Sequence, residues 1–399
     1  MITRQRRVTA GALLSAALLA GALLAGCGST AAVPQAARPA PPVTPSLATS
    51  QAYAGETWAV VVMGGSSAAH NDFWQLFTRP AGAAKWTLAT PLGVADNGGL
   101  AVAEVGARSL VTAFRPSQDL TFSPLSASQD GGAHWSQSGL LADGLADFPT
   151  AFAGAPSGGL IALTRGGDTE VAARAGAAWS SLAAEHAVAA SPAGRACGLA
   201  RLTAAAFSST GMPLLAGQCT RPGTVGIFAS ASGTWRLSGP ALPSALARRD
   251  IEVLGLASDG ATSVALMQAG SGAGADLITA WSADGGQQWR LSAPLRLRAP
   301  AVRSAAFGAA GAVGVTLTGG AGAVAVAGPG AAWHSLPALP GGAAQLPAAA
   351  VTLAAAPGSG FEALIAHSGQ LSVWQLAPGS AGWEQVQLIK VTIPYGSSG

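Results

Sequence analysis

Residues 282–289, Ser-Ala-Asp-Gly-Gly-Gln-Gln-Trp, contain the pattern that decides the fold. The stretch ends in Trp289, and a tryptophan that closely follows a glycine recurs along the chain at intervals of about 44–56 residues. The members of this series are Trp86, Trp135, Trp179, Trp235, Trp289, Trp333 and Trp383. A period in this range indicates a repeat architecture. The sequence therefore predicts seven copies of one small structural unit.

Each unit has the pattern of four short antiparallel strands. In the third repeat, apolar runs at 148–153 and 160–163 end in Gly-rich and Ser-rich turns, 170–173 alternates, and a last strand follows Trp179. The fifth and sixth repeats show the same order of runs, at residues 251–256, 263–267 and 277–281, and at 302–307, 312–317 and 323–327. Four strands at this period are typical of a β-propeller. We expect an all-β domain at residues 52–399, a seven-bladed β-propeller of four-stranded antiparallel blades.

The first repeat is short, with strand patterns only at 57–63, 72–77 and 85–89. An open edge strand invites aggregation, so the ring must close. We expect a terminal segment to supply the missing strand, and Ile389–Ile393 is the candidate.

The N-terminus has the composition of an export signal. Arg4, Arg6 and Arg7 precede an apolar run at 8–25 that ends in Leu-Ala-Gly-Cys at 24–27. These features are typical of a secretory signal peptide. The last four residues resemble a bacterial lipobox, which implies cleavage before Cys27 and lipidation of its sulfur. The alternative is an uncleaved membrane anchor, for which the run is short.

The segment after Cys27 is rich in Ala and Pro and carries one charge, Arg38. We therefore expect a signal peptide at 1–26 and a lipidated flexible tether at 27–51. Removing the three signal-peptide arginines leaves the basic residues equal in number to the 18 acidic ones. A neutral chain gives no reason to expect a nucleic-acid partner.

Two cysteines remain after Cys27. Cys197 and Cys219 are expected to form a disulfide, the usual state of a cysteine pair in an exported protein, and a buried pair of free thiols is the alternative. Neither has His or Cys neighbours at zinc-ligand spacing, so we expect no metal site.

Residues 128–135 share the pattern Ser-x-Asp-x-Gly-x-x-Trp with 282–289. The pattern resembles the Asp-box, or BNR repeat, of sialidases and other bacterial propellers. Asp and Ser side chains bind nearby backbone groups, glycine accepts positive φ, and Trp fills the space between sheets. We therefore assign a structural role to Ser128, Asp130, Gly132, Trp135, Ser282, Asp284, Gly286 and Trp289.

The resemblance raises the hypothesis of a sialidase, which uses a tyrosine nucleophile. The two tyrosines, Tyr53 and Tyr395, lie near the ends of the expected domain, outside clear inner-strand positions. Arg115 is the one faint match to the sialidase arginine motif, and we expect it to be a loop residue. His70 and Asp72 are spaced so that they could bind a metal together, but we expect them to belong to a solvated loop. We predict no catalytic residue, no cofactor site and no metal site, and the sequence leaves enzymatic activity open.

The leading hypothesis is a non-enzymatic binding module or scaffold, anchored by lipid on Cys27 at the extracytoplasmic face of the cell membrane, with an envelope protein or a glycan as partner. The alternative is a carbohydrate-binding protein or sialidase-like glycoside hydrolase of the cell envelope. Phe73, Trp74 and Trp374 are its candidate sugar-stacking aromatics, unless they belong to the strand core.

Overall fold

The structure is a computed structural model that describes residues 47–391 apart from short segments. These segments are 65–71, 92–98, 115–121, 137–143, 232, 273, 299–300, 319–321, 341–342, 344–345, 347–349, 357–359, 368 and 378–379. All described residues belong to one compact unit, Pro39–Gly399. The signal peptide, Cys27 and most of the expected tether lie outside the described residues.

The described residues are predominantly β-strand, as the turn spacing predicts. The first half of the chain contains β1 (Ala48–Tyr53), β2 (Glu56–Gly64), β3 (Asp72–Arg79), β4 (Thr87–Leu88), β5 (Leu100–Glu104), β6 (Leu110–Phe114), β7 (Leu125–Ser128), β8 (Pro149–Gly154), β9 (Leu160–Thr164), β10 (Asp168–Ala172) and β11 (Ser180–Ala184). The second half contains β12 (Leu199–Phe207), β13 (Pro213–Cys219), β14 (Gly226–Ala231), β15 (Thr234–Leu237), β16 (Ile251–Ser258), β17 (Ser263–Ala269), β18 (Asp276–Ser282), β19 (Arg290–Leu291), β20 (Leu295–Arg296), β21 (Val302–Phe307), β22 (Val313–Leu317), β23 (Ala323–Val326), β24 (His334–Ser335), β25 (Val351–Ala355), β26 (Phe361–His367), β27 (Gln370–Leu376) and β28 (Glu384–Lys390).

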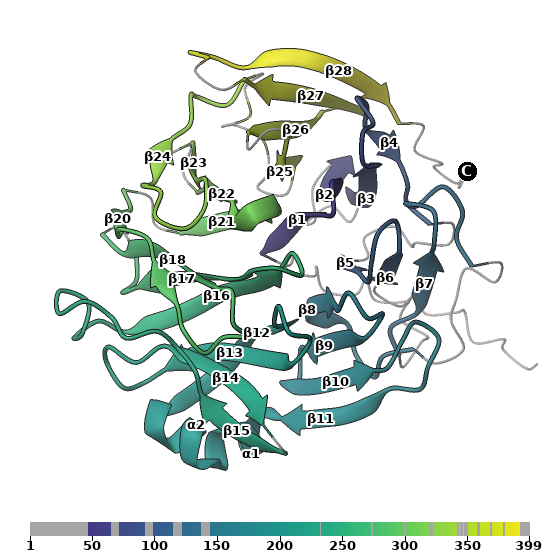
Figure 1. The fold of residues 1–399 in the computed structure, drawn as a ribbon. Helices are drawn as coiled ribbons and strands as arrows, with labels where there is room; N and C mark the ends of the chain where they lie inside the picture. Colours follow the sequence, from purple (N-terminus) through teal and green to yellow (C-terminus); the bar gives the residue numbers. More distant parts are fainter. Residues whose placement is uncertain are drawn as a thin grey trace, which may run out of the picture. The chain divides into compact units, whose positions relative to one another are not determined.

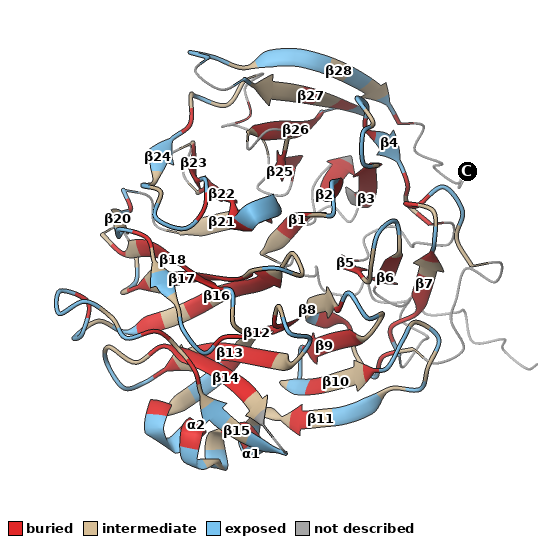
Figure 2. Ribbon diagram, viewed as in Figure 1, coloured by how far each residue is buried: buried red, intermediate tan, exposed pale blue. Residues whose placement is uncertain are grey.

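Consecutive strands pair antiparallel to form meanders around a common centre (Figure 1). Two meanders merge into an eight-stranded sheet because β1 pairs with β2 and also, in parallel, with β21. Two others merge into a nine-stranded sheet through the contact of Gln218 on β13 with Glu252 on β16. The inner strands are mostly buried and the outer ones, such as β28, mostly exposed (Figure 2). The expectation of an all-β domain is therefore confirmed.

The core consists of apolar layers between neighbouring meanders. One layer joins Val60 on β2 and Leu76 on β3 to Val102 on β5 and Leu110 on β6. Another joins the opposite faces of β2 and β3 to β26 and β27. Alternate residues of one strand thus face different neighbours, because strand side chains point alternately to the two sides of a sheet.

The predicted closing strand is wrong. Residues 384–390 form β28, which pairs with β27 of its own meander. The first meander instead has four local strands, because β1 begins at Ala48, ahead of residue 52, and forms a hairpin with β2. The Ala/Pro-rich composition before residue 52 concealed this strand, whose Thr49 and Ser50 are buried.

A helical insertion lies between β11 and β12. It contains α1 (Glu185–Ala190) and α2 (Pro192–Cys197), with Ser191 capping the backbone N–H of Gly194. The predicted disulfide is confirmed: Cys197 at the end of α2 is bonded to Cys219 at the end of β13. The insertion is therefore tied covalently to the sheet. No helix among the described residues is long and apolar enough to cross a membrane.

Candidate functional site

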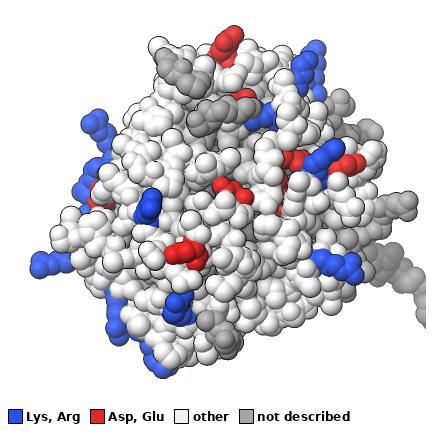
Figure 3. All heavy atoms as spheres, in the orientation of Figure 1, with Lys and Arg blue, Asp and Glu red and all other residues white. Residues whose placement is uncertain are grey.

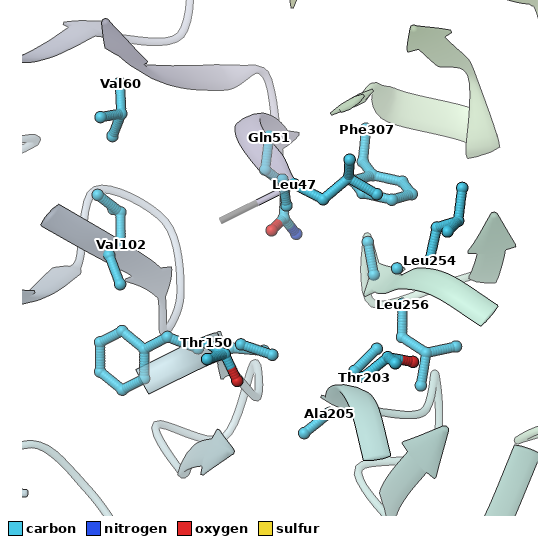
Figure 4. Close-up of a pocket in the computed structure, with 18 of the residues that line it drawn as sticks. Leu47, Gln51, Val60, Val102, Thr150, Thr203, Ala205, Leu254, Leu256 and Phe307 are labelled. Carbon is cyan, nitrogen blue, oxygen red and sulfur yellow. The ribbon is translucent and has the colours of Figure 1, made fainter. Parts of the chain in front are cut away.

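The centre of the ring is nearly filled by side chains. A cavity of about 60 Å³ lies there, lined by residues of β1, β2, β5, β8, β12, β16 and β21. Figure 4 shows Leu47, Val102, Leu256 and Phe307 around it. The amide of Gln51 also lines it and donates to the backbone oxygen of Ser258 at 3.0 Å. The centre therefore has no room for a substrate larger than a few water molecules.

A larger hollow, here called the turn pocket, opens where several strand-connecting turns meet. Its volume is about 610 Å³. The walls are almost entirely small residues, namely Ala52, Gly55, Gly82, Ala83, Ala84, Ala309, Ala310, Ala312, Ala355, Ala356 and Gly360, and the polar side chains are Thr57 and Arg79. A second hollow of about 470 Å³ shares Gly360 and includes His334 and Phe361. The face in Figure 3 is likewise mostly uncharged.

Both polar side chains of the turn pocket are already bonded within the protein. Arg79, which is 4% exposed, donates to Glu362 Oε2 and, at 2.7 Å, to the oxygen of Ala355. Its guanidinium lies 5.0 Å from the centre of the Trp86 ring. Burial lowers the pKa of Arg79, and the charge of Glu362 opposes this shift. Thr57 donates to the oxygen of Ala355. The described residues of the pocket therefore offer a ligand small apolar groups and no free polar side chain.

Five of the seven recurrent tryptophans join their meander to a neighbouring one through the indole N–H. The indole N–H of Trp289 donates at 2.7 Å to the backbone oxygen of Ser238, which follows β15. Equivalent bonds to backbone oxygens run from Trp135 to Ala89 and from Trp383 to Pro337. Trp333 donates to the hydroxyl of Ser292 and Trp86 to the carboxylate of Glu362. Trp86 is fully buried and the other tryptophans of the series are half-buried. The indole N–H groups thus link neighbouring meanders by hydrogen bonds, a role that the spacing of the tryptophans alone did not reveal.

The residues of the two Ser-x-Asp-x-Gly-x-x-Trp stretches form matching turns. Ser282 Oγ donates to Asp284 Oδ1 at 2.8 Å and accepts from the N–H of Gly286. Asp284 Oδ1 also accepts from the N–H groups of Gln287 and Gln288. These bonds, with that from Gln288 the largest contribution, lower the pKa of Asp284.

Ser128 and Asp130 repeat the arrangement, and Asp130 also binds His134 Nδ1 at 2.6 Å. The N–H of His134 is the largest of the contributions that hold the pKa of Asp130 well below its usual value. His134 is 88% exposed, so the pair lies at the surface.

One polar cluster has no counterpart among the residues singled out from the sequence. Glu56 and Glu104 are 1% and 6% exposed, and the carboxylate oxygens of both have no hydrogen-bond partner among the described residues. The same is true of the indole nitrogen of Trp58. Burial is the main cause that raises the pKa of both acids, and the charge of Glu56 raises that of Glu104 further. The only signal in the sequence is an acid at one terminus of two apolar strands: Glu56 begins β2 and Glu104 ends β5.

The other residues singled out from the sequence form no site among the described residues. Cys27, His70, Arg115 and Tyr395 lie outside the described residues, as does the side chain of Phe73. Trp74 is 5% exposed and belongs to the core, and Trp374 is half-buried. Tyr53 lies on β1, a central strand, contrary to the position inferred from the sequence. Within the described part of the chain, no three His, Cys, Asp or Glu side chains are grouped to hold a metal.

The sequence matches no family model and no curated protein. Its structure, however, is similar to solved structures. A 6-phosphogluconolactonase-like protein from Bacteroides uniformis has a TM-score of 0.52 at 12% identity, with 84% of this chain and 97% of that chain covered. The fold is a β-propeller.

Other propellers align less closely. YCF48 from Cyanidioschyzon merolae has a TM-score of 0.47 at 13% identity and covers 82% of this chain and 94% of its own. The Aleuria aurantia lectin has a TM-score of 0.40 at 14% identity, with 87% and 96% covered. At these identities the likeness extends to the propeller fold alone, so function has to be argued from the site.

Proposed function

We propose that the protein is a lipid-anchored β-propeller at the extracytoplasmic face of the cell membrane, where it binds a protein partner and catalyses no reaction. The observation that carries this proposal is the chemistry of the turn pocket. Sites for small ligands usually measure about 300–1,000 Å³ and contain a few polar groups that orient the ligand. The turn pocket has this size, but Arg79 and Thr57 are bonded internally. Its walls suit an apolar side chain of a partner better than a sugar.

The two adjoining hollows support an extended partner segment. They share Gly360 and together follow the turns of β1–β4, β21–β24 and β25–β28. Main-chain groups at such turns supply hydrogen bonds to a peptide, and the alanine-lined hollow takes an apolar side chain. Residues on loops of a rigid scaffold commonly carry binding functions.

We further propose seven blades, each a run of consecutive antiparallel strands. The runs are β1–β4, β5–β7, β8–β11, β12–β15, β16–β19, β21–β24 and β25–β28. The two Ser-x-Asp-x-Gly-x-x-Trp turns follow the third strand of a run in both cases, which supports their assignment as Asp-boxes. The lipid anchor rests on the lipobox-like residues 24–27 and the basic N-terminus.

Site-specific photo-crosslinking in intact cells tests the partner. A photoreactive residue at Ala84, which is exposed and lines the turn pocket, should capture one dominant envelope protein. The matched control is Ala187, exposed on α1. Ala196→Trp on α2 should leave capture from position 84 unchanged, whereas Ala309→Trp, which fills the pocket, should abolish it. Capture of glycan alone, or equal capture from both positions, would contradict the proposal and favour the carbohydrate alternative.

The anchor has a separate test. The wild-type chain should incorporate a radioactive fatty acid and the Cys27→Ser chain should not. Equal labelling of the two chains would refute lipidation at Cys27.

A further inference from the structure

Two buried acids lie between the first two meanders. On β2, Trp58 and Val60 face the layer that holds Leu100 and Val102 of β5. Alternate residues of a strand share a face. Glu56 therefore lies on the same face of β2 as Trp58 and Val60, and Glu104 lies on the same face of β5 as Leu100 and Val102. The acids therefore lie at the same end of one interface, and the effect of Glu56 on the pKa of Glu104 agrees with their proximity.

Neither acid is compensated by the surrounding side chains. No ion pair to Glu56 or Glu104 is present among the described residues. Arg108 is the nearby cation: its backbone N–H and its charge both lower the pKa of Glu56, but burial outweighs them, and its guanidinium donates to the backbone oxygen of Asp130. Buried charges in proteins are normally paired or coordinate a metal. Two buried carboxylates without an ion-pair partner among the described residues therefore call for a positively charged ligand.

The equivalent junction elsewhere in the ring shows that the fold does not require acids there. Gly131 packs against Glu56: a side-chain carbon on Gly131 would lie 2.5 Å from Glu56 Oε1. Gly285, which follows Asp284 as Gly131 follows Asp130, packs in the same way against Thr210. Hydroxyl groups of Ser208, Ser209 and Thr210 fill that junction, and each is hydrogen-bonded.

We propose that Glu56 and Glu104 are the charged ligands of a Ca²⁺ site between β2 and β5. Two carboxylates balance one divalent ion. Ca²⁺ accepts six to eight oxygen ligands in flexible geometry, including bidentate carboxylates, backbone oxygens and water, whereas Mg²⁺ demands a near-ideal octahedron. A coordination shell of two carboxylates and several uncharged oxygens therefore suits Ca²⁺ better than Mg²⁺. The site is independent of the proposed partner binding, because its residues do not line the turn pocket.

The experiment compares the full-length chain, purified in detergent, with its Glu56→Gln/Glu104→Gln variant. At about a hundredfold excess of Ca²⁺ over the dissociation constant, the wild-type Tm should rise by about 4 °C. The double variant should not respond, and the control Glu252→Gln, which lies in an exposed ion pair with Arg201, should respond like the wild type. Mg²⁺ should give a smaller rise.

Terbium luminescence provides a readout that does not depend on stability. Tb³⁺ replaces Ca²⁺ in oxygen-ligand sites and is excited by a neighbouring indole, here Trp58. Titration of the wild type should give a saturable signal that Ca²⁺ displaces and that Trp58→Phe reduces severalfold. If Ca²⁺ changes neither the Tm nor the terbium signal of the wild type, the acids are a protonated pair and the proposal is wrong. An equal response of the double glutamine variant would also refute it.

Discussion

The buried ion pair between Arg79 and Glu362 should be strongly coupled to the stability of the domain. It joins β3 to β26 across 283 residues of sequence, and both side chains are only 5–6% exposed. Glu362 accepts from Arg79 and, at 2.8 Å, from the indole of Trp86. The substitution Glu362→Ala leaves a buried guanidinium and an indole N–H without their acceptor. Breaking a buried pair on one side costs about 3–5 kcal/mol, and we expect a loss in this range.

Urea unfolding followed by tryptophan fluorescence measures the loss. The slope of the free energy against urea should stay unchanged, so that the midpoint reports stability. The control is Arg201→Ala, which breaks an exposed ion pair with Glu252 and should cost less than about 1 kcal/mol. The double variant Arg79→Leu/Glu362→Leu removes both charges and should be more stable than Glu362→Ala. A cost below about 1 kcal/mol for Glu362→Ala, or a double variant less stable than the single one, would refute the reasoning.

Three further outcomes are expected. Trp289→Phe keeps an aromatic ring but loses the hydrogen bond to Ser238, which should cost about 0.5–1.5 kcal/mol in the same urea assay. No change in stability would mean that this bond does not help to hold the two meanders together. The hydrogen bonds that lower the pKa of Asp284 stabilise the fold above pH 3.8, the unfolded-state value, and this contribution disappears as pH falls through the lower folded-state pKa. Acid titration of Asp284→Asn should therefore show a shallower loss of stability than the wild type, and parallel curves would contradict this. Replacing Cys197 and Cys219 by serine frees a 22-residue loop and should cost about 3 kcal/mol, and a variant as stable as the wild type in urea would exclude this contribution.

The repeats were predictable because their signals are local. Glycine, aspartate and serine end each strand, so the strands expected at 251–256, 263–267 and 302–307 lie within or coincide with β16, β17 and β21. The first strand was missed because it has no such local signal. Residues 48–53 follow a proline-rich segment, and their pairing with β21 depends on contacts made far along the chain.

The site residues were largely beyond prediction because their meaning depends on distant partners. Arg79 is an ordinary residue at the end of a strand until Glu362 and Trp86 enclose it. Glu56 and Glu104 occur in a chain in which only 10% of residues are charged, and an acid beside an apolar strand usually lies in solvent. Nothing in their spacing indicates that two strands bring them to the same buried junction.

The parallel pairing of β1 with β21 bypasses the last meander. Main-chain hydrogen bonds run unbroken from β24 to β4, while β25–β28 forms a separate sheet. Side-chain contacts hold that sheet at the seam, among them the Arg79–Glu362 pair and the two bonds of Gln387 to the backbone of Trp86. Because no main-chain ladder joins the C-terminal sheet to its neighbours, we expect its amides to exchange with deuterium as one cooperative group, before those of the continuous sheet.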